Sequence, residues 1–235
     1  MIIQLTRQAH GKPPAPLRFE FTRMYNAGYV GRNQEEVKKH IQELAAKGIP
    51  GPAHTPTLYP VGCHSLCTSP GIDVYGGETC GEAEYVLFIE NDRAIHVGLG
   101  SDHTDRFLEK TDIPRSKQVC PNMIGTTVWP LEDIMGHWDE ILLKSTAIHE
   151  GKEILYQEGK LAAILPPDKL MAFVRERAGA SLDNSVIFSG TLSLKTGDFV
   201  CGEGFRAELS DLRLERKLEL AYSVRPLFSL NPGED

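Results

Sequence analysis

Hydrophobic and polar residues alternate with a period of two in several short segments. Leu17, Phe19 and Phe21 alternate with polar residues, which is typical of a half-buried strand. Residues 84–89 form a mostly aromatic and β-branched run, residues 91–93 are a polar turn, and residues 94–99 are again largely apolar. This order predicts two strands joined as a hairpin.

The second half of the chain shows the same pattern. Residues 140–165 predict a further hairpin region, with turns near residues 150–152 and 158–160. Residues 186–189 predict another strand, and apolar positions alternate again between residues 199 and 224.

Helical spacing is confined to two segments. Val37, Ile41 and Leu44 form an apolar stripe over residues 34–47, with Asn33 as an N-cap and Gly48 as a stop. Prolines 166 and 167 open a second short helix that runs to about residue 178.

These elements predict a mostly β fold with peripheral helices, in the α+β class. The 22 glycines and 15 prolines favour many turns and short strands over a helical bundle. We expect residues 1–75 to form a segment with a strand, a helix and loops. Residues 76–235 are expected to form a β-rich catalytic unit, and the whole chain is short enough to be one domain.

Charge and composition narrow the function classes. The net charge of −7 and the lack of a basic run make nucleic acid a poor partner. Apolar runs such as residues 161–165 are far too short to span a membrane. The five cysteines are scattered, which argues against a secreted disulfide framework. We therefore expect a soluble, cytoplasmic protein.

Acidic residues cluster around the first predicted hairpin. Glu82 and Glu84 share one face of a strand, and Asp102 and Asp105 follow the end of its partner strand. Carboxylates that converge would repel one another unless they held a cation, and Mg²⁺ or Mn²⁺ prefers such oxygen ligands. The alternative is a solvated strand face with acidic residues at alternate positions.

Five motifs in order resemble the fumarylacetoacetate hydrolase superfamily. In chain order, the motifs are Gly31-Arg32-Asn33, Glu82-x-Glu84 before an apolar strand, Asp102 to Arg106, Lys117 with Cys120-Pro121, and Ser189-Gly190-Thr191 before the turn at residues 195–198. The similarity covers residues 28–209.

The resemblance implies a mixed β-sandwich roll that binds Mg²⁺ or Mn²⁺. Glu82, Glu84 and Asp102 match the metal ligands, and Lys117 matches a catalytic lysine. Positions that match substrate-binding residues are Thr191, Gly190, Arg106 and Arg32. The implied protein is a homodimer that cleaves a C–C bond in a small 2-oxo or β-dicarbonyl acid through an enolate stabilised by the ion.

The helix at residues 34–47 departs from the family pattern. The histidine and glutamate expected there fall on Val37 and His40. Glu36 and Glu43 share a helix face with His40, so Glu36 and His40 could replace them as catalytic residues, or could form an ordinary exposed pair. The departure leaves two alternatives open, a metal-dependent decarboxylase or tautomerase and a non-catalytic binder of small acids.

Two further clusters have competing interpretations. Cys63, Cys67 and Cys80 lack paired metal-ligand spacing, so buried thiols are the better interpretation than zinc. His103 lies either behind the Asp102 site or on a surface turn, and Arg106 either pairs with Asp105 or binds a substrate carboxylate.

Overall fold

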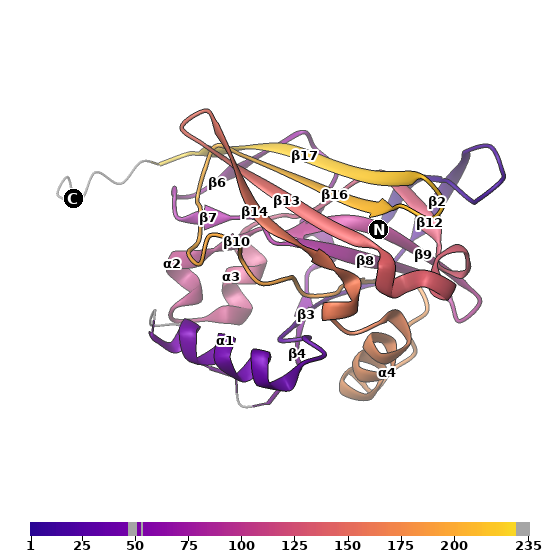
Figure 1. Ribbon diagram of the computed structural model, residues 1–235, viewed down its shortest axis with the longest axis horizontal. Helices are drawn as coiled ribbons and strands as arrows, with labels where there is room; N and C mark the ends of the chain where they lie inside the picture. Colours follow the sequence, from indigo (N-terminus) through magenta and orange to yellow (C-terminus); the bar gives the residue numbers. More distant parts are fainter. Residues whose placement is uncertain (47–50, 53, 229–235) are drawn as a thin grey trace.

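A computed structural model describes residues 1–46, 51–52 and 54–228 of the chain. The side chains of Gln34, His40, Glu43, Leu44 and Ala46 lie outside that description. The elements form two main sheets with helices at one side (Figure 1). Within the described residues, no helix is long and apolar enough to cross a membrane.

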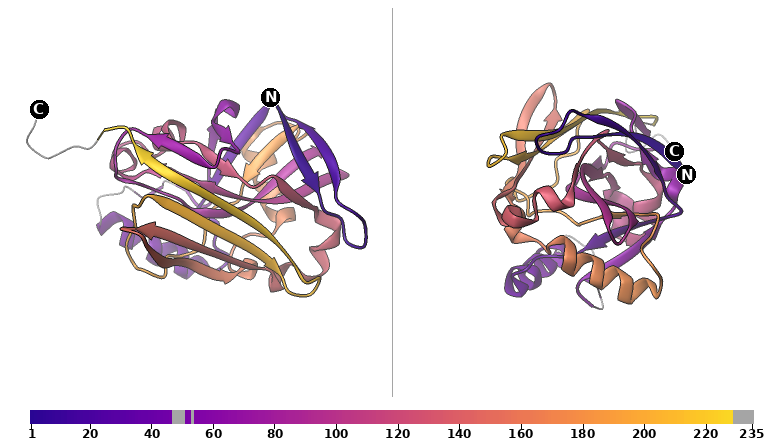
Figure 2. Two further views of the ribbon diagram at one scale, coloured as in Figure 1. Left: turned by 90° about the horizontal axis from the view of Figure 1, so that it is seen from above. Right: turned by 90° about the vertical axis from the view of Figure 1, so that its right-hand side faces the viewer.

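The larger sheet contains both strands of the first predicted hairpin at its centre. Its strands lie in the order β2 (Ala15–Glu20), β1 (Ile2–Arg7), β12 (Thr127–Pro130), β9 (Ala94–Asp102), β8 (Ala83–Asn91), β15 (Ser185–Phe188), β3 (Arg23–Gly28) and β4 (Thr57–Val61). Off this path, β11 (Asn122–Ile124) pairs with β9 and with β5 (Leu66–Cys67). Figure 2 shows the β1–β2 hairpin at the opposite end of the molecule from the last residues of β17.

The smaller sheet is built from the C-terminal part of the chain and one earlier strand. Its order is β14 (Lys152–Lys160), β13 (Leu142–His149), β16 (Gly204–Asp211), β17 (Arg216–Pro226) and β6 (Gly71–Val74). In addition, β7 (Thr79–Cys80) pairs with β10 (Thr104–Asp105). The turn expected at residues 158–160 is wrong, because β14 pairs with β13 through to Lys160.

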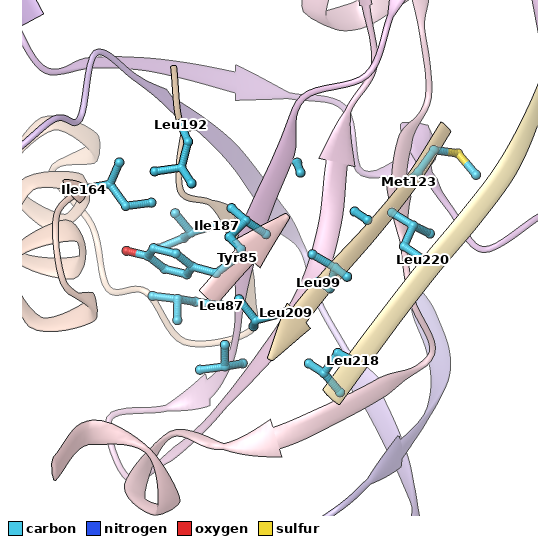
Figure 3. Close-up of a cluster of buried hydrophobic side chains, with 14 of the residues drawn as sticks. Tyr85, Leu87, Leu99, Met123, Ile164, Ile187, Leu192, Leu209, Leu218 and Leu220 are labelled. Atoms are coloured by element: carbon cyan, nitrogen blue, oxygen red, sulfur yellow. The ribbon is translucent and has the colours of Figure 1, made fainter. Parts of the chain in front are cut away.

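The core lies between the two sheets. Figure 3 shows Tyr85, Leu87 and Leu99 from β8 and β9 together with Leu209 and Leu218 from β16 and β17. Residues 84–89 of β8 are all at most 1% exposed, because one face meets this core and the other meets a second cluster under β1 and β2. Glu84, the polar residue of this stretch, is therefore held in a buried position.

The helices are α1 (Gln34–Ala46), α2 (Arg106–Glu109), α3 (Ile113–Val119) and α4 (Pro167–Ala178), with short 3₁₀ turns at Cys63–Ser65, Leu131–Asp133, Met135–Glu140 and Leu161–Ala163. The Asn33 side chain accepts a hydrogen bond from the Glu35 amide at 3.1 Å, which confirms the predicted N-cap of α1. The stop predicted at Gly48 lies outside the described residues. Both α1 and α4 lie on the side away from β16 and β17 (Figure 1).

The mostly β architecture with peripheral helices agrees with the fold class predicted from the sequence. Asn91 to Ala94 form the turn of the central hairpin, where the polar residues indicated it. The helix predicted over residues 166–178 is α4, and Gly179 ends it with a φ of +61°.

Candidate metal centre

The ends of the central hairpin bring three carboxylates together. Glu84 lies in β8, Glu82 directly precedes that strand, and Asp102 ends β9. The Asp102 amide donates to the Glu82 carbonyl at 3.1 Å, which fixes the two chain segments side by side. One carboxylate oxygen from each of these residues lies within 4.8 Å of the others. The structure thus places the three residues that the sequence predicted as metal ligands in one cluster.

Lys117 reaches this cluster from α3. Its Nζ lies 3.0 Å from Glu82 Oε2 and 2.8 Å from Asp102 Oδ2, and it donates to Thr104 Oγ1 at 3.0 Å. Burial alone would lower the pKa of Lys117, but Asp102 and Glu82 raise it well above its usual value. The side chain is therefore a buried ammonium ion with three partners.

Arg106 contacts the other side of Glu82. Its Nη2 lies 2.9 Å from Glu82 Oε1 and its Nη1 2.8 Å from Glu109 Oε2, while Nε donates to Cys80 Sγ at 2.9 Å. The guanidinium lies 4.1 Å from the ring centre of Phe199. Burial raises the pKa of Glu82, but Arg106 and Lys117 outweigh it and lower that pKa to about 2.

The negative charges of Glu84 and Asp102 are less well compensated than that of Glu82. Burial, followed by Asp102 and Glu82, raises the pKa of Glu84 well above its usual value, although Glu84 Oε2 accepts a hydrogen bond from the Gly190 amide at 2.8 Å. Burial also dominates at Asp102, whose pKa rises to about 6 despite Lys117. Asp102 Oδ1 is buried without a hydrogen-bond partner in the described part of the chain.

The donor set and its charge fit a divalent cation. Ionised Glu82, Glu84, Asp102 and Glu109 carry two more charges than Lys117 and Arg106 neutralise. A Mg²⁺ or Mn²⁺ ion would supply the two missing positive charges, and the unpartnered Asp102 oxygen could coordinate it. Glu82, Glu84 and Asp102 are the residues that would hold it.

A turn at Gly190 closes the cluster from the side of β15. Gly190 has a φ of +81°, and a Cβ there would lie 2.6 Å from Val30 and 3.0 Å from the Ala27 carbonyl. Thr191 Oγ1 donates to the Ala83 carbonyl at 2.7 Å and accepts from Gln157 Nε2. The Thr191 hydroxyl thus ties the turn to β8.

Gln157 is a functional residue that sequence reasoning missed. It is fully buried on β14, where its Oε1 accepts from the Ala83 amide at 3.0 Å and its Nε2 donates to the Leu192 carbonyl at 3.0 Å. A polar residue inside an alternating strand was the available signal. Its contacts join β8 to the turn after β15, so it supports both parts of the site.

A pocket with a cavity volume of about 160 Å³ opens in front of the cluster. It is lined by the predicted site residues Glu82, Glu84, Arg106, Lys117, Gly190, Thr191 and Glu36. Val37 also lines it, so an apolar residue stands where the family resemblance leads one to expect a histidine. The side chain of His40 lies outside the described residues.

The structure does not bring Arg32 into this pocket. Its guanidinium binds both carboxylate oxygens of Asp139, at 3.0 and 2.6 Å, and donates to the Ile164 carbonyl at 2.6 Å. Arg32 is not among the residues that line the pocket. The substrate-binding interpretation of Arg32 is therefore replaced by a role in joining β3 and α1 to the segment before α4.

Other sequence hypotheses are also settled by contacts. Asp105 caps α2 by accepting from the Leu108 amide at 2.9 Å, so it is not the partner of Arg106. His103 is 1% exposed and sits between Tyr222 and Thr79, behind Asp102 rather than on a surface turn. Within the described residues, Cys63, Cys67 and Cys80 form no metal-ligand cluster.

Comparisons with known proteins agree with this architecture. Residues 27–222 match the family described as "Protein of unknown function (DUF2848)", so the chain belongs to that family. The curated proteins contain no significant match.

Among solved structures, a 2-keto-3-deoxy-D-arabinonate dehydratase complexed with magnesium and 2,5-dioxopentanoate has a TM-score of 0.62 at 13% identity, covering 88% of this chain and 74% of that one. A fumarylacetoacetate hydrolase from Exiguobacterium antarcticum has a TM-score of 0.57 at 16% identity, covering 91% and 81%. A 4-oxalocrotonate decarboxylase from Pseudomonas putida G7, complexed with calcium and acetate, has a TM-score of 0.55 at 12% identity, covering 86% and 76%. The fold is that of the fumarylacetoacetate hydrolase superfamily, as the sequence resemblance indicated.

Proposed function

We propose that the chain is a divalent-metal-dependent hydrolase that cleaves a C–C bond in a small 2-oxo or β-dicarbonyl acid. The observation that carries the proposal is the buried cluster of Glu82, Glu84 and Asp102 at the edge of a pocket. The similar structures include a magnesium complex and a calcium complex of enzymes that act on oxo acids. A divalent ion held by the three carboxylates would act as a Lewis acid toward the adjacent oxygens of such a substrate.

The chain's own residues would prepare this chemistry in three ways. Lys117 places a buried positive charge beside the cluster, where it would favour negative charge that develops on the substrate oxygen. Gly190 fixes Glu84 through its amide, and Gln157 and Thr191 fix the turn that carries Gly190. Glu36 lines the pocket from α1 and could accept a proton from water, whereas Glu109, which also lines the pocket, is paired with Arg106.

A panel of acylpyruvates and other 2-oxo acids, assayed with Mg²⁺ or Mn²⁺, tests the proposal. We expect turnover that disappears with a chelator and returns when the metal is restored. Asp102→Asn should abolish both metal binding and turnover, whereas Asp92→Asn, at an exposed position in the β8–β9 turn, should change neither. Full activity of Asp102→Asn or of chelated protein would refute the proposal.

Val37 favours a second candidate, a decarboxylase or tautomerase that uses the same metal cluster. An apolar side chain lines the pocket where water activation by a histidine would be expected from the family resemblance. Product analysis separates the candidates: hydrolysis gives two fragments and incorporates solvent oxygen, decarboxylation releases CO₂, and tautomerisation conserves mass. Glu36→Gln should slow only the hydrolytic reaction.

A further inference from the structure

The cations that line the pocket are already bound to protein groups. Each Arg106 nitrogen has a partner within 3 Å: Nε lies 2.9 Å from Cys80, Nη1 2.8 Å from Glu109 and Nη2 2.9 Å from Glu82. The Nζ of Lys117 has three acceptors between 2.8 and 3.0 Å, which equals the number of its N–H donors. Lys117 cannot bind a substrate carboxylate without giving up a buried partner. Nη2 of Arg106 makes no hydrogen bond within the described residues, but the charge of Arg106 is already balanced by Glu82 and Glu109.

The remaining pocket walls are largely apolar or aromatic, with Asn33 and Ser193 as neutral polar residues and with acidic residues as the other charged groups among the described side chains. Aliphatic and aromatic lining residues beyond the metal cluster are Tyr29, Val30, Tyr59, Ile113, Leu194 and Phe199. The other charged lining residues among the described side chains are Glu36 and Glu109, both negative. Glu109 is 7% exposed and comes from α2, next to Arg106.

From these walls, and resting on the proposed function, we infer that the substrate is an oxo acid with a single carboxylate and an uncharged, largely apolar tail. The 2-oxo-carboxylate end would coordinate the divalent ion that the metal cluster holds. A second carboxylate on the tail would meet Glu36 and Glu109, with the pocket's cations already paired. Glu109 is buried, and juxtaposed like charges exclude the wrong ligand more strongly than a lost apolar contact does.

The test compares 2-oxohexanoate with 2-oxoadipate, which have the same six-carbon chain and differ at the terminal methyl or carboxylate. Binding of each is measured by calorimetry to the full-length chain loaded with Mg²⁺. We expect the affinity for 2-oxohexanoate to be at least about tenfold higher than that for 2-oxoadipate. Repulsion between like charges in a binding site produces an effect of this size. Equal binding, or tighter binding of 2-oxoadipate, would overturn the inference while leaving the proposed function in place.

Glu109→Gln tests the cause of the preference. The substitution removes one acidic wall and releases Nη1 of Arg106 from its ion pair, so it should narrow or reverse the ratio of the two affinities. Glu176→Gln, on the exposed side of α4, removes the same charge away from the pocket and should leave that ratio unchanged. An unchanged ratio in folded Glu109→Gln would contradict the assigned cause, and the wild-type comparison decides the inference if that variant fails to fold. Failure of both acids to bind the metal-loaded chain would overturn the proposed function together with the inference.

Discussion

The backbone amide of Gly190 donates a 2.8 Å hydrogen bond to Oε2 of Glu84, which lies 106 residues earlier in the chain. This bond connects the turn after β15 to the middle of the acidic cluster. It needs a left-handed backbone at Gly190 and close packing against Val30 and the Ala27 carbonyl. The orientation of a proposed metal ligand thus depends on a residue with no side chain.

Gly190→Ala should therefore weaken metal binding. A Cβ at this position would meet Val30 at 2.6 Å in a backbone conformation that disfavours side chains, so the turn would shift and release Glu84. We expect the affinity for Mn²⁺, measured by calorimetry, to fall about tenfold or more, as is usual when a group that orients a ligand is lost.

Gly179→Ala is the matched control for that variant. Gly179 also has a positive φ, +61°, but a Cβ there would meet nothing within 4 Å. We expect the free energy of unfolding to fall by about 1 kcal/mol while Mn²⁺ affinity stays at the wild-type value. Equal affinities in the two variants would show that the Gly190 turn does not position Glu84.

Glu84→Gln should separate stability from metal binding. Burial and the neighbouring carboxylates raise the pKa of Glu84, so its ionised form opposes folding of the metal-free protein. The amide oxygen can still accept from Gly190. We expect the unfolding free energy without metal to be unchanged or raised by up to about 2 kcal/mol. Thermal unfolding with added Mn²⁺ checks the effect on metal binding: Mn²⁺ should stabilise the wild type and should not stabilise the variant.

Lys117→Met should destabilise the metal-free chain strongly. The substitution leaves Glu82 and Asp102 buried without the ammonium ion that bridges them. Removing one member of a buried charged network costs about 3–5 kcal/mol, measurable by denaturant unfolding. Added Mg²⁺ should restore part of this loss. Lys169→Met, on the exposed surface of α4, should change stability little, and a similar loss in both variants would argue against the network.

His103 should contribute a pH dependence to stability. Burial, followed by the Arg106 charge, lowers its pKa from 6.5 to about 3, so the folded protein keeps it neutral where the unfolded chain binds a proton. Stability should therefore fall as the pH decreases from 6.5 toward 3, with His103 accounting for about 2 kcal/mol between pH 6.5 and 5. His103→Gln should show a shallower decrease over this interval, measured by denaturant unfolding. Identical pH profiles would contradict the buried neutral assignment.

The hairpin and its acidic residues were predictable because their signals are local. Glu82, Glu84 and Asp102 lie at the open end of two strands whose apolar run and polar turn define their pairing. The expected turn at residues 158–160 failed, because residues of both polarities continue in β14 when one face is covered and the other exposed. Periodicity alone did not distinguish a turn from an edge strand there.

Contacts made by tertiary packing were not accessible in this way. Arg32 lies in a motif that resembles the family pattern, yet its side chain binds Asp139 and the Ile164 carbonyl and does not line the pocket. Gln157 becomes important only because β14 passes beside the Gly190 turn. For Glu109, its spacing of three residues from Arg106 on α2 was a usable signal for the ion pair, but not for its place in a pocket wall.

The central claim is that Glu82, Glu84 and Asp102 hold one divalent cation. A crystal structure of the chain with Mn²⁺, using anomalous scattering to locate the ion, tests it most directly. We expect one strong peak bound by oxygens from all three carboxylates, including the Asp102 oxygen that has no other partner. A fully loaded crystal with manganese elsewhere, and with these carboxylates paired only with Lys117 and Arg106, would contradict the claim.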